Sequence, residues 1–330
     1  MYVKRNIRWS VIWRFAWKNL LIFTIWSAFV SWLFVYFEGQ DVNIGIPFLP
    51  LSTIGIAVAF YIGFKNSQSY DRFWEGRKVW GQIVNTSRSF ATKVLSYTNG
   101  KLDPEEAKKI VYRQLAWINS LRIQLRGTTI FDRKNLSHVP NFGLSNDREC
   151  QECIAFFLQG SEYSDIVNKA NPAAQLLKIQ SDELTQLKSN KVIDEFEHVS
   201  FMKEIEVLYD QQGKCERIKN TPFPRQYAYF SLVFVWLFIL LLPFGMIEEF
   251  HAMGGESTVW LTVPFSVLIS WVFSTMEVVG DNSEDPFENY VNDVPMSAIC
   301  RTIEIDLMQM MGEPDDKIPT KVQPVGDVLL

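Results

Sequence analysis

The sequence predicts an all-α membrane protein, with four transmembrane helices per subunit and a helical cytoplasmic domain. The prediction rests first on four apolar segments in a chain of 330 residues, 21% of which are charged. About 20 helical residues, at about 1.5 Å of rise each, cross a hydrocarbon core, so each segment is long enough to span it. The segments are Asn19–Phe37, Ile44–Phe64, Gln226–Ile247 and Ser257–Met276. The remaining chain is polar and shows no sustained strand pattern or internal repeat.

The first apolar segment is predicted to be a transmembrane helix rather than a cleaved signal peptide. It is longer and more aromatic than a signal-peptide core, and no small-residue cleavage site follows it. Aromatic residues near the ends of the spans support the assignment, because amphipathic rings prefer the membrane interface. These residues are Trp13, Trp17, Tyr36, Tyr227, Tyr229 and Trp260.

Charges beside the spans predict their orientation. The first 19 residues carry five basic side chains and no acidic one, which favours a cytoplasmic N-terminus. The short links at 38–43 and 248–256 contain acidic residues and no Lys or Arg, whereas basic residues flank the long middle segment. We therefore expect the middle segment and both termini in the cytoplasm, and the protein in the bacterial inner membrane. The four cysteines all lie in the predicted cytoplasmic parts, where thiols stay reduced.

These observations divide the chain into four parts. Residues 1–64 hold the N-terminal segment and two spans, 65–225 the cytoplasmic helical domain, 226–280 the other two spans, and 281–330 a cytoplasmic C-terminal segment with its tail. In the cytoplasmic domain, Asp103 is a predicted N-cap with Glu106 reaching back to it, and Gly127 ends that helix.

Three further helices are predicted from capping and breaking residues. One opens at Asn171 and continues through Leu187, and the next extends from about residue 192 to near Gly213. The last extends from about residue 295 to 311 and stops at Gly312. The final 18 residues contain three prolines, so we expect a loose extended tail.

Signatures of enzymes are missing from the sequence. It contains no GxxxxGK[ST], GxSxG or HExxH motif, and its three histidines are far apart. Cys150 and Cys153 have CxxC spacing without a second pair, so buried thiols are favoured over a zinc site. His198 stands among acidic residues and is expected to be solvated. We do not expect an enzyme.

The stretch NSQSYDRFWEGRKVWG, residues 66–81, follows the second apolar segment without a break. If the helix continues into water, Arg72 can meet Glu75 and Glu75 can meet Lys78 at i,i+3 spacing. Ion pairs of this kind would stiffen the joint between membrane and cytoplasm. A rigid spanning helix that continues into the cytoplasm is also suited to form the wall of a pore.

This stretch, with PFLPLSTIGIAVAFYIGFKNS before it, TPFP at 221–224 and EDPFENYVNDVPM at 284–296, resembles the bestrophin family, in particular its bacterial-type branch. The resemblance covers nearly the whole chain and implies a homopentameric ion channel lined by the second helix of every subunit. The signature residues that carry it are Asn66, Arg72, Trp74, Glu75, Arg77, Trp80 and Gly81. It implies as partners further copies of the chain, the lipid bilayer and the permeant ions, with no nucleic acid.

The second span presents one apolar face that the resemblance identifies as the neck of the pore. Ile56, Phe60 and Phe64 recur every four residues, so they share a helix face. Such faces more often meet lipid or other helices, and the resemblance is what places them at a constriction that can gate by losing its water. By the same resemblance Phe196 forms the cytoplasmic aperture, with Ile193, Glu195 and Glu197 as alternatives.

Ion selectivity follows less directly, because the family implied by the resemblance contains both anion and cation channels. Phenylalanine rings around an axis tend to present their positive edges, which favours an anion at Phe60. The acidic outer loops favour cations, but exposed charges are screened within about 8 Å at physiological salt. We therefore expect a chloride channel, with a sodium channel as the alternative. An anchored scaffold or signalling protein remains the alternative of another class, while spans without ionisable residues disfavour a transporter.

A cluster of oxygen ligands follows the fourth span, where calcium-gated members of the family hold a calcium clasp. It comprises Asp281, Asn282, Glu284, Asp285, Glu288, Asn292 and Asp293. Pro286 interrupts the acidic run, so a solvated helix-capping turn is the competing interpretation, and Asp293 before Pro295 suits a cap. We expect that no cofactor is required and that any calcium site here is weak.

Overall fold

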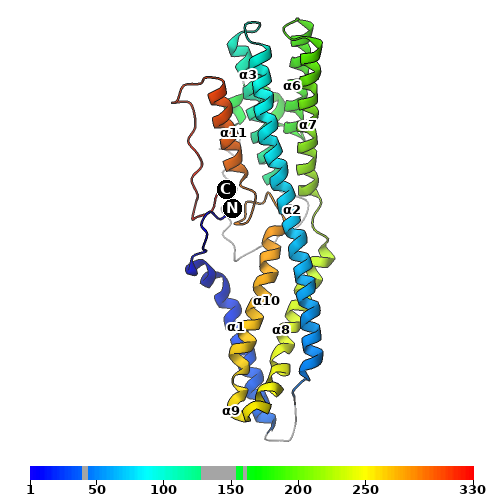
Figure 1. Cartoon of the computed structure of the whole chain (residues 1–330), viewed down its shortest axis with the longest axis vertical. Coiled ribbons are helices and arrows are strands. Elements are labelled where there is room, and N and C mark those ends of the chain that lie inside the picture. Colours follow the sequence, from blue (N-terminus) through cyan, green and yellow to red (C-terminus); the bar gives the residue numbers. More distant parts are fainter. Residues whose placement is uncertain (39–43, 128–153, 159–161) are drawn as a thin grey trace.

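One helix, α2 (Phe48–Tyr97, 50 residues), extends through both halves of the molecule (Figure 1). The computed structural model describes residues 1–38, 44–127, 154–158 and 162–330, and within them it contains helices and two isolated β-bridges but no strand. The continuation of the second span past Phe64 is therefore confirmed. The helix begins at Phe48, four residues after the start of the apolar run, because proline suits the start of a helix and Pro50 still lies in its first turn.

The lower half of Figure 1 holds the apolar helices α1 (Trp9–Glu38), α8 (Arg225–Gly254) and α10 (Thr262–Glu284), joined through the short α9 (Glu256–Val259). With α2 they are four helices long and apolar enough to cross a membrane, as the sequence predicts. α10 packs on α1, α2 and α8. The side chains at their centre include Phe23, Ile62 and Phe238, all buried.

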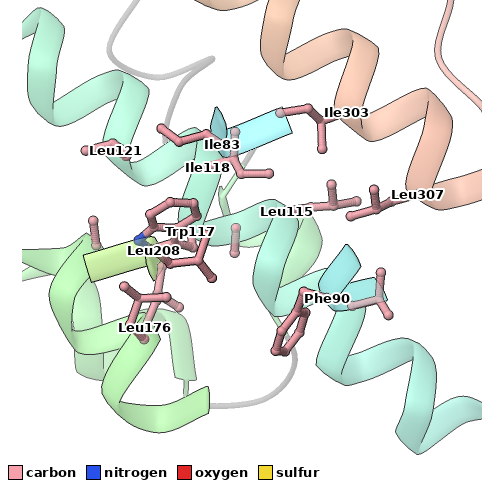
Figure 2. Packing of buried hydrophobic residues seen from close by; sticks show 14 of the residues in the cluster. Ile83, Phe90, Leu115, Trp117, Ile118, Leu121, Leu176, Leu208, Ile303 and Leu307 are labelled. Carbon is pink, nitrogen blue, oxygen red and sulfur yellow. The ribbon is translucent and has the colours of Figure 1, made fainter. Parts of the chain in front are cut away.

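The upper half packs the second part of α2 against α3 (Pro104–Arg126), α6 (Pro172–Ser189), α7 (Glu195–Asn220) and α11 (Met296–Met310), with the short α5 (Glu162–Val167) beside α6. Figure 2 shows their shared core, in which Trp117 of α3 lies among side chains of α2, α6 and α7. Trp117 is 1% exposed, and its Nε1 donates to Gln212 Oε1 at 3.1 Å.

Capping residues begin these helices largely as predicted. Asp103 accepts from the backbone N–H of Glu105 at 3.3 Å, and Asn171 from that of Ala174 at 3.0 Å. The predicted end of a helix near Gly213 is wrong, because α7 continues to Asn220. An interior glycine costs only about 1 kcal/mol, and the packing of α7 against α2 and α6 outweighs it. α7 instead begins at a capping box that Asp194 forms with Glu197.

The expectation of a loose tail is wrong as well. Val328 is buried, its neighbour Leu329 donates to the carbonyl of Met1 at 2.8 Å, and Val3 donates to the carbonyl of Asp327 at 2.9 Å. Asp327 also pairs with Lys4 and Arg8 at 3.0 and 2.5 Å. Prolines prevent a helix here, but an extended backbone can still bond to another extended segment, and Figure 1 shows both ends of the chain together.

The described cysteines are buried free thiols. Burial raises the pKa of Cys300 to about 12 and raises the pKa of Cys215 as well, so neither forms a reactive thiolate. Cys150 and Cys153 lie outside the described residues.

Candidate pore-lining helix and its anchors

The predicted neck residues lie together on a face of α2 that the described helices of the subunit leave largely exposed, although the ring of Phe64 lies 6.4 Å from that of Tyr227 on α8. Ile56 is 72% exposed, Phe60 79% and Phe64 49%. The other side of α2 buries small and aliphatic residues against α8 and α10, including Val58 and Ile62. The exposed face is apolar and lies within a membrane-spanning helix, so it must meet lipid, further protein or the interior of a pore.

The predicted aperture residue lies at the start of α7 and is more exposed than any neck residue. Phe196 is 86% exposed. Of the alternatives, Ile193 is 2% exposed and packs in the core of the upper half of the molecule, Glu195 pairs with Lys188 at 2.5 Å, and Glu197 belongs to the capping box. Phe196 is therefore the only one of these four side chains without an intrachain role in packing, pairing or capping.

The charges in the signature stretch pair between helices, and the predicted pairs within α2 are wrong. Arg72 donates to the backbone carbonyls of Glu284 at 2.9 Å and Ile218 at 3.2 Å, and its guanidinium lies 3.9 Å from Asp285. Glu75 pairs with Arg217 of α7 at 2.6 Å. These contacts hold α2 against α7 and against the end of α10. Pairing between helices is favoured here because it also satisfies backbone carbonyls at the ends of α7 and α10.

Other signature residues serve close packing. Trp80 is fully buried, while Trp74 is 46% exposed and stacks on Tyr70 with ring centroids 6.4 Å apart. Asn66 Nδ2 donates to the carbonyl of Met276 at 3.1 Å, and its side chain lies against Gly280, where a Cβ would not fit. Arg77 approaches Gly81, whose added Cβ would lie 3.5 Å from its NH1 atom.

Three residues that sequence reasoning missed also anchor α2. Gly76 faces the ring of Phe287, which would lie 3.0 Å from an added Cβ. Lys65 and Glu277 form a buried ion pair, with side chains 1% and 3% exposed. Their positions offered a signal, since each charge directly follows an apolar segment.

Several carboxylates of the predicted calcium site lie against basic side chains. Asp281 pairs with Lys65 at 2.5 Å, Glu288 with Lys219, and Glu284 lies 3.8 Å from Arg225. Within the described residues, no group of three His, Cys, Asp or Glu side chains could hold a metal ion. Asn292 is exposed, and Asn282 lies on α10. The arrangement favours a capping turn over a calcium site.

Asp293 is the centre of that turn. Its Oδ1 accepts from the backbone N–H groups of Phe287 and Val294 at 2.6 Å each, and its Oδ2 accepts from that of Asn289 at 2.5 Å. Phe287 and Asn289 have φ values of +86° and +67°, which lie in the left-handed region that residues other than glycine rarely occupy. The buried carboxylate therefore holds a strained turn that packs on Gly76.

Glu75→Ala is expected to cost at most about 1 kcal/mol of stability. The pair of Glu75 with Arg217 is partly solvated, at 41% and 63% exposure of the two side chains, so water replaces the lost partner. Thermal unfolding of the detergent-solubilised variant would measure the cost, with Arg217→Ala as the matched control. A loss of assembly in Glu75→Ala alone would show that the glutamate is buried between subunits.

Comparisons with known proteins agree with this architecture. The family model described as bacterial and fungal bestrophin protein matches residues 3–309. The voltage-dependent anion channel-forming protein YneE of Escherichia coli K12 is 29% identical over 309 residues, which cover 93% of this chain and 90% of that protein. The protein of the same name from Salmonella typhi is 32% identical over 281 residues, covering 84% and 81%. The crystal structure of a bestrophin homologue from Klebsiella pneumoniae superposes with a TM-score of 0.76 at 26% identity, covering 92% of this chain and 99% of that one.

Proposed function

Because the chain belongs to the bacterial and fungal bestrophin family, we propose that it forms an anion channel whose neck is lined by α2. The observation that carries the proposal is the exposed apolar stripe of Ile56, Phe60 and Phe64 on a spanning helix. Relatives of similar length are named anion channel-forming proteins. Ions would pass the neck and leave through a ring of Phe196 on the cytoplasmic side.

A single subunit cannot enclose a pore with one helix, so the proposal requires a symmetric oligomer, which we take to be a homopentamer. Closing a ring of five copies would cover the sides of each α2 and leave the stripe facing the axis. The basic N-terminal segment and the even number of spans support cytoplasmic termini, and we take the membrane to be the bacterial inner membrane. The long α2 would then carry the pore wall from the membrane into a cytoplasmic vestibule.

The neck favours anions for a physical reason. It offers neither carboxylates nor backbone carbonyls to replace the water around a cation, since the backbone of α2 bonds to itself. Chloride is larger and less tightly hydrated than sodium, so it loses less on entering an apolar ring, and phenyl edges attract it. The acidic outer loops oppose this preference, but exposed loop charges are screened within about 8 Å at physiological salt. Carboxylates elsewhere along the pore would instead support a sodium channel of the same family.

Native mass measurement of the purified complex is expected to show five copies of the chain. The apolar stripe would otherwise face lipid on every copy and could not enclose water. A stable monomer in mild detergent would contradict the proposal. A closed ring with a different number of subunits would change the radius of the pore but not the helix that lines it.

Phe60→Ile is expected to shift the reversal potential toward the sodium equilibrium potential. The substitution keeps an apolar, though shorter, side chain and removes the phenyl edges that favour chloride. Bilayer recordings under a sodium chloride gradient would measure the shift. Glu249→Gln is the matched control for the outer loop, and its effect should appear only at low salt. An unchanged reversal potential in Phe60→Ile would assign the selectivity to another part of the pore.

A further inference from the structure

A buried charge cluster joins three helices next to the neck. Lys65 of α2 lies between Glu277 and Asp281, which are one turn apart on α10, and its Nζ lies 2.5 Å from Asp281 Oδ1. Ser231 of α8 donates to the other oxygen of Glu277 at 2.6 Å. Lys65, Glu277 and Ser231 are each at most 2% exposed. A charged group at this depth is expensive to bury, so its partners are functional candidates.

The cluster controls the rotation of α2 at the position where the neck ends. Consecutive residues of an α-helix are about 100° apart around its axis, so the direction of Lys65 determines the direction of Phe64. Asn66 adds its bond to the carbonyl of Met276 on the same side. Both anchors directly follow Phe64 in the sequence, and Phe64 is the last residue of the exposed stripe.

We propose that Lys65, Glu277 and Ser231 are positioning residues for the neck, which hold α2 at the rotation that directs Phe64 toward the pore axis. The inference rests on the proposed channel and adds to it a link between the outer helices and the gate. When Glu277 no longer attracts Lys65, the ammonium is held by Asp281 alone, one turn further along α10. α2 then rotates, and the ring of Phe64 leaves the axis.

Glu277→Gln tests the link because it keeps the size of the side chain and removes its charge. We expect an assembled oligomer in which the single-channel conductance rises by about threefold, the size of effect that residues coupling two elements produce. Ser231→Ala should give a smaller rise, and the double variant no more than Glu277→Gln alone, because the serine acts through the glutamate. The exchange of charges in Lys65→Glu with Glu277→Lys should restore the wild-type conductance, since the new lysine can pair with both carboxylates.

Ser274→Ala is the control, because it removes a hydrogen bond from Asn19 of α1 at 3.2 Å on the same helix but outside the cluster. Its conductance should equal that of the wild type. If Glu277→Gln does not assemble, Ser231→Ala decides, with its smaller expected rise. Two results together would overturn the inference and leave the proposed neck intact. The assembled cluster variants would have wild-type conductance, and Phe60→Ala would still alter the current. If Phe60→Ala is silent as well, the proposed neck itself is wrong.

Discussion

Phe60→Ala raises the current through each channel by about tenfold, which corresponds to about 1.4 kcal/mol removed from the barrier to permeation. Phe60 is the middle residue of the exposed stripe, and the described helices of its own subunit leave its side chain 79% exposed. Truncation to alanine therefore widens the constriction and lets water remain in it, without removing a contact from the core. Single-channel recording in planar bilayers measures the change, and native mass measurement checks that the oligomer persists.

Phe29→Ala is the matched control for this prediction. Phe29 has a similar ring that is 47% exposed, but it lies on α1, which packs on α10 and α8 away from the stripe. We expect its current to equal that of the wild type, because its ring faces lipid. A silent Phe60→Ala with an altered Phe29→Ala would mean that a different helix lines the pore.

Asp293→Ala destabilises the protein by about 4 kcal/mol, because it leaves backbone N–H groups without their charged acceptor. The carboxylate is 4% exposed and holds a turn with two residues in the left-handed region, so water cannot replace it readily. Thermal unfolding of the solubilised protein measures the loss. Asp293→Asn should lose less, since its amide keeps one acceptor oxygen, and Asn292→Ala at the exposed neighbour should lose little.

The same experiment decides between a capping turn and a calcium site. If Asp293 serves the backbone alone, adding calcium or a chelator leaves the unfolding temperature of the wild type unchanged. A calcium-dependent rise in that temperature, absent from Asp293→Asn, would show that the turn binds the ion and that its ion pairs rearrange to do so.

The four spans and the long second helix could be predicted because apolar length and helix continuity are local properties. The caps at Asp103 and Asn171 could likewise be predicted, because the residues that directly follow them are typical of a helix start. Partners across helices could not be predicted in this way. Arg72 and Glu75 have suitable partners at i,i+3 spacing, yet they bind backbone carbonyls and Arg217, which only the packing of α7 and α10 brings near.

Two further differences have the same origin. Gly213 weakens a helix locally, but the packing of α7 along its whole length outweighs that local preference. The tail is rich in proline, yet Asp327 finds Lys4 and Arg8 at the opposite end of the chain. In the candidate site, the periodicity of Ile56, Phe60 and Phe64 predicts one face, and the structure exposes that face. Which copies of the chain meet there is a property of the assembly.

The reversal potential of the purified wild-type protein in a planar bilayer, under a sodium chloride gradient, tests the central claim most directly. A neck of phenyl edges without coordinating oxygens predicts a value close to the chloride equilibrium potential. A value at the sodium equilibrium potential would contradict this account of the neck, and the absence of any current would contradict the channel itself.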